Sequence, residues 1–574
     1  MSEWSRCSSE LLAKLISQFC KENLLQPVDN RLDLGGVSYI FEATRGAFGS
    51  WRVAADSIRR TTAGILGNDE SEVATDPIQF FVEAAGVLGL DGSTVAGYVA
   101  ELTSTLAADV RMASTAVAPA ELLELHHSRL EGHLTGHPLL VANKGRLGFS
   151  ASDSLRYTPE ARTPLRLVWL AVRRGLAEFR GTPDLSEHSV VGRELGPSVL
   201  ETFRAQLVDP DSYVWLPCHP WQLDHVLRTQ WARELATGEI VVLGEGPDEY
   251  LPTQSIRTMV NIANPARYQV KLPLKILNTS VYRGIPEHCT LAAPMITQWL
   301  RGLWSRDEVF IRLGTELLGE VASVAVRHPQ LSTAPGIPYQ WTETLGCIWR
   351  DPIDPRLRPG ESVWPLAAVL HPGLALELIT RAGTDPQTWL SHLLATLLRP
   401  LLHLMHHYGI TVNPHGENLA IITNPNSLPA RLVIKDLVDD INISTTPVDA
   451  RGPEPDSHHR VLPRKPWHIL RQYLVDALLL GVLNPLSDLN LIPEDTFWGL
   501  ARGEIDLYTT THPEYADRLE ATALTAETFA RYPLNAYRLT LGYKDLDTRP
   551  PIPTTGRIPN PLSKVLPIPP ERPW

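Results

Sequence analysis

The stretch NPHGENLAIITNPNSLPARLVIKD (residues 413–436) contains two β-type runs joined by a turn-rich segment. ENLAIIT and ARLVIKD flank NPNSLP, and this order predicts a β-hairpin. A hairpin returns Asp436 to the neighbourhood of Asn418. A side-chain carbonyl and a carboxylate are hard oxygen ligands of the kind that hold Mg²⁺ on nucleotide phosphates. The stretch therefore predicts a metal site at Asn418 and Asp436, against the alternative that each residue only caps a turn.

Regular elements are expected on both sides of this hairpin. Before it, WLSHLLATLLRPLLHLMHHYG predicts a long helix closed by Gly409. After it, residues 548–574 are dense in proline and should be extended. Upstream, QVKLPLKILNTSVYR (residues 269–283) alternates apolar and polar residues, which predicts one strand with a basic face. Pro273 lacks an N–H, so the strand should lie at a sheet edge or carry a bulge.

The whole chain predicts an α+β fold in three parts. The first part, residues 1–135, has helical spacing in FFVEAAGVLGL and VAGYVAELTSTLAADVRMA and should be mostly helical. In the mixed central part, 136–350, PLRLVWLAVRRGLAEF (164–179) repeats the helical spacing, whereas SYVWLPC and EIVVLG predict strands. The C-terminal part, 351–574, should hold the hairpin, which resembles a kinase metal site, and the proline-rich tail.

Basic and hydroxyl side chains gather upstream of the hairpin. LPTQSIRTM supplies Ser255, Arg257 and Thr258, and Lys271 and Arg283 follow. Such donors suit a triphosphate whose charge must be neutralised while pyrophosphate leaves. The alternative is a surface strand pair with ordinary charges.

A second basic stretch, GHPLLVANKGRLGFS, places His137, Lys144 and Arg146 among glycines, where backbone can approach a ligand closely. Taken alone, it is equally typical of a solvated basic turn. Two histidine clusters raise the question of zinc, namely His126, His127, His133 and His137, and His403, His406 and His407. No HExxH motif occurs and no cysteine lies at ligand spacing, so zinc is disfavoured.

Composition excludes several classes of protein. The 574 residues carry a formal net charge of −12, which disfavours nucleic acid or an anionic membrane as a partner. Five scattered cysteines fit reduced thiols better than a disulfide framework. The N-terminus predicts an amphipathic helix rather than a signal peptide, and no segment approaches 18 apolar residues without charge. We expect a cytoplasmic protein with access to ATP.

Six short blocks together resemble, in order, those of the IucA/IucC family of siderophore synthetases that work independently of nonribosomal peptide synthetases. They are HPLLVANKGRLGFS, LPCHPWQ, SIRTM, KLPLKILNTSVYR, NPHGENLAI and VIKDLVDD. The resemblance implies a three-part molecule likened to a cupped hand, with ATP and a polycarboxylate, most commonly citrate, in a cleft. It implies adenylation of the acid, release of pyrophosphate, and transfer of the acyl group from AMP to an amine or alcohol. A homodimer is expected by the same analogy.

The resemblance also implies roles for individual residues. Lys144, Arg146, Ser255, Arg257, Thr258 and Lys271 would bind ATP, and Asn418 and Asp436 would bind Mg²⁺. Thr279, Arg283, His415 and Glu417 would contact the polycarboxylate, with Arg283, His415 and Lys271 closest to the chemistry. Glu417 stands where Gln is commoner in the family, and Asn413 where Glu is commoner, which puts the identity of the acid in doubt.

Two other functions compete with this interpretation. HGEN followed by a hairpin and KD also resembles the catalytic loop of kinase-like phosphotransferases, but the chain has no Gly-rich loop and no VAIK-type lysine. The second competing function is that of a non-catalytic family member, which only binds its ligand. It is disfavoured because the phosphate-facing positions all hold competent residues.

Overall fold

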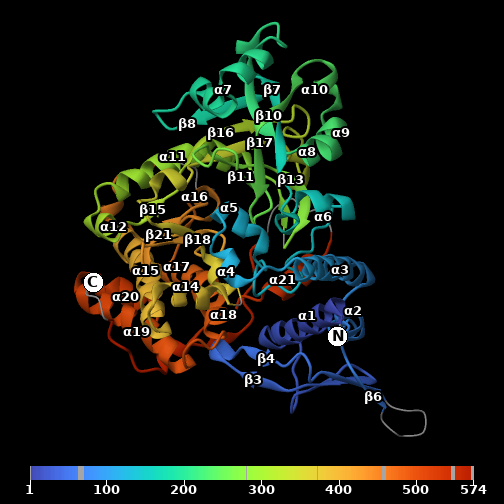
Figure 1. Ribbon diagram of the computed structural model, residues 1–574, viewed down its shortest axis with the longest axis vertical. Helices are drawn as coiled ribbons and strands as arrows, with labels where there is room; N and C mark the ends of the chain where they lie inside the picture. Colours follow the sequence, from blue (N-terminus) through green and yellow to red (C-terminus); the bar gives the residue numbers. More distant parts are fainter. Residues whose placement is uncertain are drawn as a thin grey trace.

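The computed structural model describes residues 2–62, 70–279, 281–371, 373–455, 461–543 and 550–570. Its centre is an eight-stranded sheet in the order β8-β16-β17-β12-β11-β10-β7-β9, with every neighbouring pair antiparallel. The strands are β7 (Leu165–Arg173), β8 (Ala177–Gly181), β9 (Tyr213–Cys218), β10 (Ile240–Pro252), β11 (Thr258–Asn261), β12 (Gln269–Lys271), β16 (Glu320–Val326) and β17 (Gly346–Arg350). Figure 1 shows this sheet in the upper part of the molecule, with α7 (Glu187–Arg204) above it and α11 (Glu287–Trp304) packed against β16. The predicted mixture of helices and strands is confirmed.

The helix predicted at residues 164–179 is wrong, because these residues form β7 and β8. Leu167, Trp169, Leu170 and Val172 are all buried, so the apolar run is nearly continuous. A buried strand covered on both faces cannot be told from a buried helix by periodicity alone. The strands predicted from SYVWLPC and EIVVLG are confirmed as β9 and the start of β10.

The strand predicted across residues 269–283 is divided at Pro273. β12 ends at Lys271, and β13 (Leu274–Asn278) pairs instead with β14 (Val281–Arg283) in a separate two-stranded sheet. An edge position is wrong for β12, which lies between β17 and β11 in the middle of the large sheet, whereas β13 is an edge strand and shows the register shift of a bulge between Leu274 and Leu277. The chain leaves that sheet just before Pro273, so the missing N–H disrupts no ladder hydrogen bond. Lys271, which belongs to the predicted basic face, is only 1% exposed, and this excludes the alternative of an ordinary charge on a surface strand pair.

The C-terminal hairpin is confirmed. β20 (Leu419–Thr423) and β21 (Pro429–Ile434) pair antiparallel with Leu419 opposite Ile434, inside the sheet β15-β21-β20-β18. The outer strands are β15 (Glu316–Leu317) and β18 (Ser362–Pro365). The predicted long helix is α15 (Pro386–Tyr408), which ends at Gly409 with φ 61° and packs on β21 and on α19 (Glu494–Thr511). The end of β21 thereby lies beside the large sheet, where Asp436 meets β12 and β17.

The N-terminal part contains strands that the sequence analysis did not predict. Helices α1 (Glu3–Lys21), α2 (Pro77–Ala84) and α3 (Gly92–Ser114) appear as expected. Between α1 and α2 lie a four-stranded sheet and the hairpin of β3 (Ala43–Arg45) and β4 (Trp51–Val53). The sheet consists of β1 (Arg31–Asp33), β2 (Val37–Ile40), β5 (Arg59–Thr62) and β6 (Glu70–Val73). Strands of three or four residues are too short to show a clear period.

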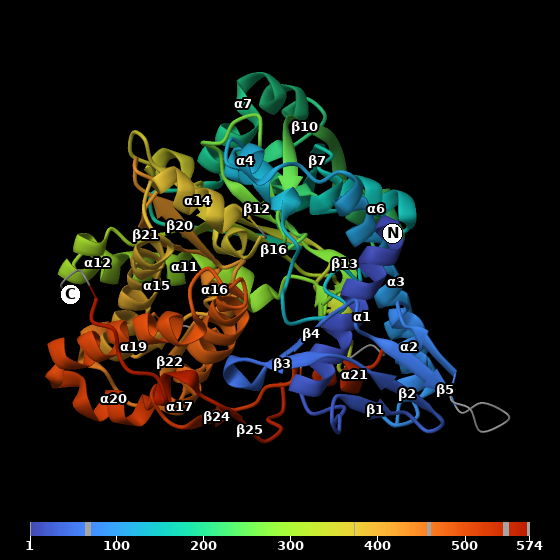
Figure 2. The same ribbon diagram turned by 60° about the horizontal axis from the view of Figure 1, so that its bottom comes forward.

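The end of the chain returns to its beginning. Helix α21 (Leu534–Leu541) contacts α1, and in Figure 2 its red ribbon lies among the blue N-terminal elements. Glu22 accepts hydrogen bonds from the backbone N–H and side-chain amide of Asn535 at 3.0 and 2.7 Å. Beyond it, residues 550–570 are largely without regular structure, as predicted, except for β25 (Arg557–Pro559) and a turn of helix at Pro561–Ser563. The rest of the predicted tail, residues 548–549 and 571–574, lies outside the described residues.

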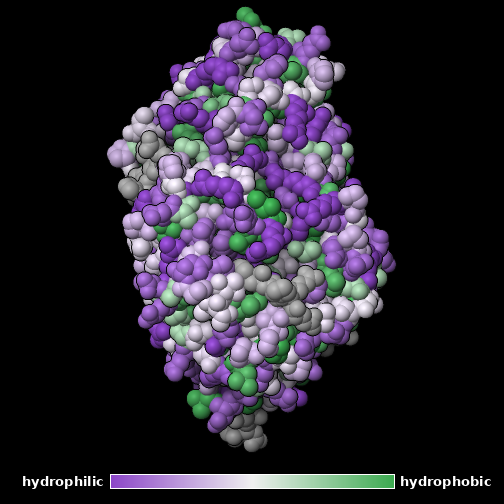
Figure 3. All heavy atoms as spheres, turned by 90° about the vertical axis from the view of Figure 1, so that its left-hand side faces the viewer, coloured by the Kyte–Doolittle hydropathy of each residue, from purple (hydrophilic) through white to green (hydrophobic). Residues whose placement is uncertain are grey.

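One stretch, Trp467–Ser487, is long and apolar enough to cross a membrane by length and composition, but 72% of its most apolar window is buried inside the protein. The helical core of a soluble protein passes the same test, so this is weak evidence of a span. On the face shown in Figure 3, hydrophilic residues predominate and hydrophobic ones are scattered in small groups.

Candidate active site

Lys271, buried at the end of β12, is the centre of a network of charges that reaches the surface through its carboxylates. Its Nζ lies 2.5 Å from Asp436 Oδ1 and 2.7 Å from Asp439 Oδ2. Arg350, at the end of the neighbouring strand β17, lies 2.8 Å from the same Asp436 oxygen. Asp436 adopts φ 63° directly after β21, and this left-handed turn precedes the short helix α16 (Leu437–Asp440) that carries Asp439. The ends of β12 and β17 and the end of the β20–β21 hairpin thus bring two cations and two carboxylates together.

Glu320, fully buried at the start of β16, supports this network. Its Oε1 lies 3.2 Å from Arg350 and 3.9 Å from Lys271, and its Oε2 accepts the N–H of Val438 at 2.9 Å. Burial alone would raise the pKa of Asp436, but the Lys271 and Arg350 cations hold it well below its usual range. Asp436 is therefore a carboxylate at neutral pH, and both cations stay charged.

Three of the predicted phosphate-binding residues adjoin Lys271. Thr258 pairs directly with Lys271 in the β11–β12 ladder, and its N–H donates to Ser255 Oγ at 3.2 Å. Arg257 donates to the carbonyl oxygen of Gly284 and lies 3.3 Å from Asp439 Oδ2. The structure therefore brings Ser255, Arg257, Thr258 and Lys271 together, as the sequence predicted.

The predicted substrate contacts lie on two hairpins. Arg283, on β14, donates to Thr279 Oγ1 at 2.6 Å, and Thr279 occupies the turn with φ 64°. The carbonyl of the next residue, Gly284, is the one that Arg257 contacts. On the other hairpin, the backbone N–H of Glu417 donates to His415 Nδ1 at 3.1 Å, which fixes the imidazole in front of β20.

The hairpin end is rich in oxygen donors. Asn418 and Asn413 both donate their amide groups to Asp440, at 2.7 and 3.3 Å, which leaves the Asn418 side-chain carbonyl for another ligand. Burial, followed by the charge of Asp436, raises the pKa of Asp440 to about 6. The carboxyl groups of Asp436 and Asp440 and the side-chain carbonyl of Asn418 are oxygen donors, and a divalent cation with oxygen ligands suits such a donor set.

Lys144 and Arg146 lie apart from the Lys271 network, each with a carboxylate of its own. Lys144 Nζ is 2.8 Å from Asp109 Oδ1 and 2.6 Å from the Thr135 carbonyl oxygen. Arg146 forms a buried ion pair with Glu160. Both cations are buried, so the solvated basic turn is excluded, but their partners are not the residues around Lys271.

Several residues of this site were not assigned from the sequence. Asp439 and Asp440 stood in the quoted block VIKDLVDD, where the run of acids was the available signal. Arg350 and Glu320 belong to no motif, because only strand pairing brings them to Lys271. His137 stood out from the sequence only in a basic stretch and in a histidine cluster, without a role in the site, yet it lines a small cavity with His415 and Glu417. Burial lowers the pKa of His137 to about 3, with His415 and Lys14 adding to the effect.

Each of the two histidine clusters acquires a carboxylate from elsewhere in the chain. His126 and His127 lie 2.6 and 3.1 Å from Asp354, and His403 lies 2.9 Å from Asp307. One group consists of His126, His127 and Asp354, and the other of His403, His407 and Asp307. In each group the side-chain nitrogen and oxygen atoms are close enough together to surround a metal ion. The same contacts are typical of histidines that simply hydrogen-bond to a carboxylate without a metal. Neither group contacts the residues of the Lys271 network.

The comparisons with known proteins agree with the blocks in the sequence. A model of the IucA/IucC family matches residues 126–371, and one described as ferric iron reductase FhuF-like transporter matches residues 387–547. The rhizobactin siderophore biosynthesis protein RhbF of Rhizobium meliloti is 37% identical over 97% of this chain and 96% of its own. Aerobactin synthase of Escherichia coli is 30% identical over 95% of each chain. Among solved structures, aerobactin synthetase IucC of Klebsiella pneumoniae matches with a TM-score of 0.84 at 26% identity, covering 98% of both chains.

Proposed function

Because this chain belongs to the IucA/IucC family of siderophore synthetases, we propose that it is an ATP-dependent ligase that adenylates a polycarboxylate and condenses it with an amine or alcohol. The observation that carries the proposal is the convergence of Ser255, Arg257, Thr258 and Lys271 on the hairpin end at Asp436. Two further relatives are named as ligases of citrate or a citryl compound, which supports citrate or a citrate derivative as the acid. By analogy with the family, the three parts form a cupped hand around the cleft, and the enzyme works in the cytoplasm as a homodimer.

In this proposal Lys271 and Arg257 exchange carboxylate partners for phosphate oxygens when ATP binds. The Asp436 and Asp439 carboxylates keep both cations charged and in place beforehand, so little reorganisation is needed at the moment of reaction. Ser255 and Thr258 add hydroxyl donors along the same turn. A bound Mg²⁺ supplies further positive charge against the departing pyrophosphate, and Asn418 and Asp436 would hold it.

Arg283, Thr279, His415 and Glu417 orient the acid. A carboxylate oxygen of the acid attacks the α-phosphorus of ATP, the bond to the pyrophosphate oxygen breaks, and an acyl adenylate forms. The amine or hydroxyl then attacks the acyl carbon, AMP leaves, and His415 accepts the proton in this proposal. Holding the reactants in one cleft supplies effective concentration, and excluding water protects the acyl adenylate from hydrolysis.

The first test is acid-dependent release of pyrophosphate, with AMP as coproduct, from ATP and Mg²⁺. The panel contains citrate, 2-oxoglutarate, succinate and citryl amides, with hydroxylamine as a surrogate acceptor. We expect release with one acid, and a loss of at least about a hundredfold in Arg257→Ala, because a preorganised cation is removed from the phosphates. Arg180→Ala is the matched control, since Arg180 is an exposed arginine on β8, paired with Glu178; it should leave the rate unchanged.

The outcomes separate the competing functions. Production of ADP in place of AMP and pyrophosphate would establish the kinase-like phosphotransferase, whose local signature is the hairpin followed by Asp436. Saturable binding of ATP or acid without any turnover would establish a non-catalytic binding protein. Either result would refute the ligase.

A further inference from the structure

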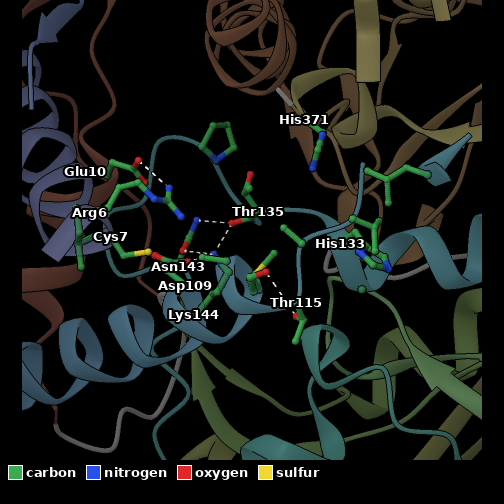
Figure 4. A pocket seen from close by; sticks show the side chains of 18 of the residues that line it. Arg6, Cys7, Glu10, Asp109, Thr115, His133, Thr135, Asn143, Lys144 and His371 are labelled. Atoms are coloured by element: carbon green, nitrogen blue, oxygen red, sulfur yellow. Dashed lines mark hydrogen bonds and ion pairs between the residues drawn. The ribbon is translucent and has the colours of Figure 1, made fainter. Parts of the chain in front are cut away.

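A cavity of about 660 Å³ lies between helices α1 and α3 and the segment 132–144 (Figure 4). This volume is within the range of small-molecule binding sites. Of the residues assigned above to ATP, metal or acid, only Lys144 contributes to its walls. The cavity is therefore a feature that the proposed roles leave unexplained.

Cations outnumber carboxylates on the cavity walls. Arg6, Lys14, Lys144 and Arg162 face it together with two carboxylates, Glu10 and Asp109. Arg6 lies 2.9 Å from Glu10, and Lys144 lies 2.8 Å from Asp109, so both carboxylates already have a partner. Figure 4 shows these two pairs on the same side of the cavity.

Lys14 has no such counterion. Among the described residues no carboxylate oxygen lies within 4.0 Å of its Nζ, and its hydrogen bond to the His137 carbonyl oxygen is long, at 3.5 Å. Burial, followed by the charge of Lys144, lowers the pKa of Lys14 to about 7, and Asp109 offsets only part of this effect. Burying a charge without a partner is costly, so an anion in the cavity would be stabilised by Lys14.

The rest of the lining favours an aliphatic carboxylate over a bare inorganic anion. Leu11, Met112, Ala113, Val117 and Leu122 supply an apolar surface beside the cations. A ligand with a hydrocarbon stem and one terminal carboxylate would satisfy both kinds of wall.

The segment 132–144 separates this cavity from the proposed acyl-transfer site. Pro138 lines both the cavity and the smaller space around His137, His415 and Glu417. We propose, on the basis of the proposed function, that the cavity binds the acceptor substrate. This acceptor is an aliphatic acid with a carboxylate at one end and the reacting amine or hydroxyl at the other. Lys14 is the counterion of its carboxylate, and the reacting end extends past Pro138 toward His415.

The test compares acceptors that differ in charge. With the acid fixed by the pyrophosphate assay, rates are measured with hydroxylamine, with ω-amino acids of four to six carbons, and with their methyl esters. In the wild type, kcat/KM for one of the amino acids should exceed that for its ester by about ten- to a hundredfold, the usual effect of a hydrogen bond to a charged group. Lys14→Met should remove this preference by raising KM for the amino acid, and Lys14→Arg should retain it.

Two controls make the result specific. Arg6→Met removes a cation from the same helix and cavity, but one that already pairs with Glu10, so the preference should persist. The hydroxylamine rate and the KM of the polycarboxylate should be unchanged in every variant.

Equal kcat/KM values for amino acids and for their esters in the wild type would overturn the inference. If hydroxylamine still reacts in that case, the ligase function stands. A changed KM for the polycarboxylate in Lys14→Met would assign the cavity to the acid and refute its assignment to the acceptor. Absence of pyrophosphate release even with hydroxylamine would refute the ligase itself and the inference that rests on it.

Discussion

Buried ionisable side chains in this protein fall into two groups. Asp436 is half-buried between two buried cations, which keep its pKa low. Glu194, on α7, is buried with hydrogen bonds from the Tyr268 N–H at 3.3 Å and the Tyr250 hydroxyl at 3.4 Å. There burial dominates and raises the pKa of Glu194 to about 7, although the Tyr268 N–H and Arg267 oppose it. The first group serves the proposed chemistry, and the second group makes stability depend on pH.

Glu194→Gln tests the second group. The folded-state pKa of Glu194 is raised, so its protonated form contributes stability that is present below pH about 4.5 and is lost as the pH rises through about 7. Glutamine cannot ionise and can bond both Tyr268 and Tyr250. We expect the variant to be more stable than the wild type at pH 8, by up to about 3 kcal/mol, and equally stable at pH 4. Melting temperatures at both pH values measure this, and a gain that is independent of pH would contradict it.

At the scale of elements, α14 and α15 each end on a glycine in the left-handed conformation, but the two glycines differ in the space around them. Gly409, with φ 61°, ends α15, and a Cβ there would lie 2.6 Å from Ser444 Oγ and 3.0 Å from Val448 Cγ2. Gly383, with φ 63°, ends α14 (Leu374–Ala382), and among the described residues no atom beyond its own chain neighbours lies within 4 Å of the same position. The two glycines form a matched pair that separates backbone strain from packing.

Gly383→Ala should cost about 1–2 kcal/mol, the usual penalty of a left-handed alanine. Gly409→Ala should cost a further 1–3 kcal/mol or so, because β22 (Asn442–Ser444) must also move. The melting temperatures of the two variants and the wild type test the order. Equal losses would show that the Ser444 side chain moves aside freely.

The same elements show what the sequence could predict. The hairpin of β20 and β21, helix α15 and the grouping of Ser255, Arg257 and Thr258 with Lys271 follow from local period, turn residues and spacing. Arg350 and Glu320 could not be found, because they reach Lys271 only through the pairing of β12 with β17 and of β17 with β16. β7 was mistaken for a helix because burial on both faces removes the alternation that identifies a strand.

At the scale of the whole molecule, the N-terminal part is completed by α21. Arg538 Nε lies 3.0 Å from Glu101 Oε2, and both side chains are buried. This ion pair joins residues from opposite ends of the chain, as does the bond between Glu22 and Asn535. An exposed pair, Arg381 with Glu124, also joins distant segments and serves for comparison.

Arg538→Met should destabilise the protein by about 3–5 kcal/mol, because Glu101 would be left buried without its cation. Adding Glu101→Gln should restore most of the loss. Arg381→Met removes an exposed partner and should cost less than about 1 kcal/mol. Thermal unfolding of the four proteins gives the comparison, and an equal effect of the two arginine substitutions would contradict the role assigned to burial.

The return of α21 to α1 also governs the order in which a newly made chain can fold. Asn535 is 513 positions from its partner Glu22. At a synthesis rate of about 5–20 residues per second, the first helix waits roughly 25–100 s for its contacts with α21. During that interval α1 can already pack against α2, α3 and β4, but the part of this N-terminal core that Leu539 covers stays open and available to chaperones. Soluble yield should therefore depend on the last 41 residues of the chain, and a stop codon just before α21 should lower it even though every residue assigned to ATP, metal and acid has by then been made.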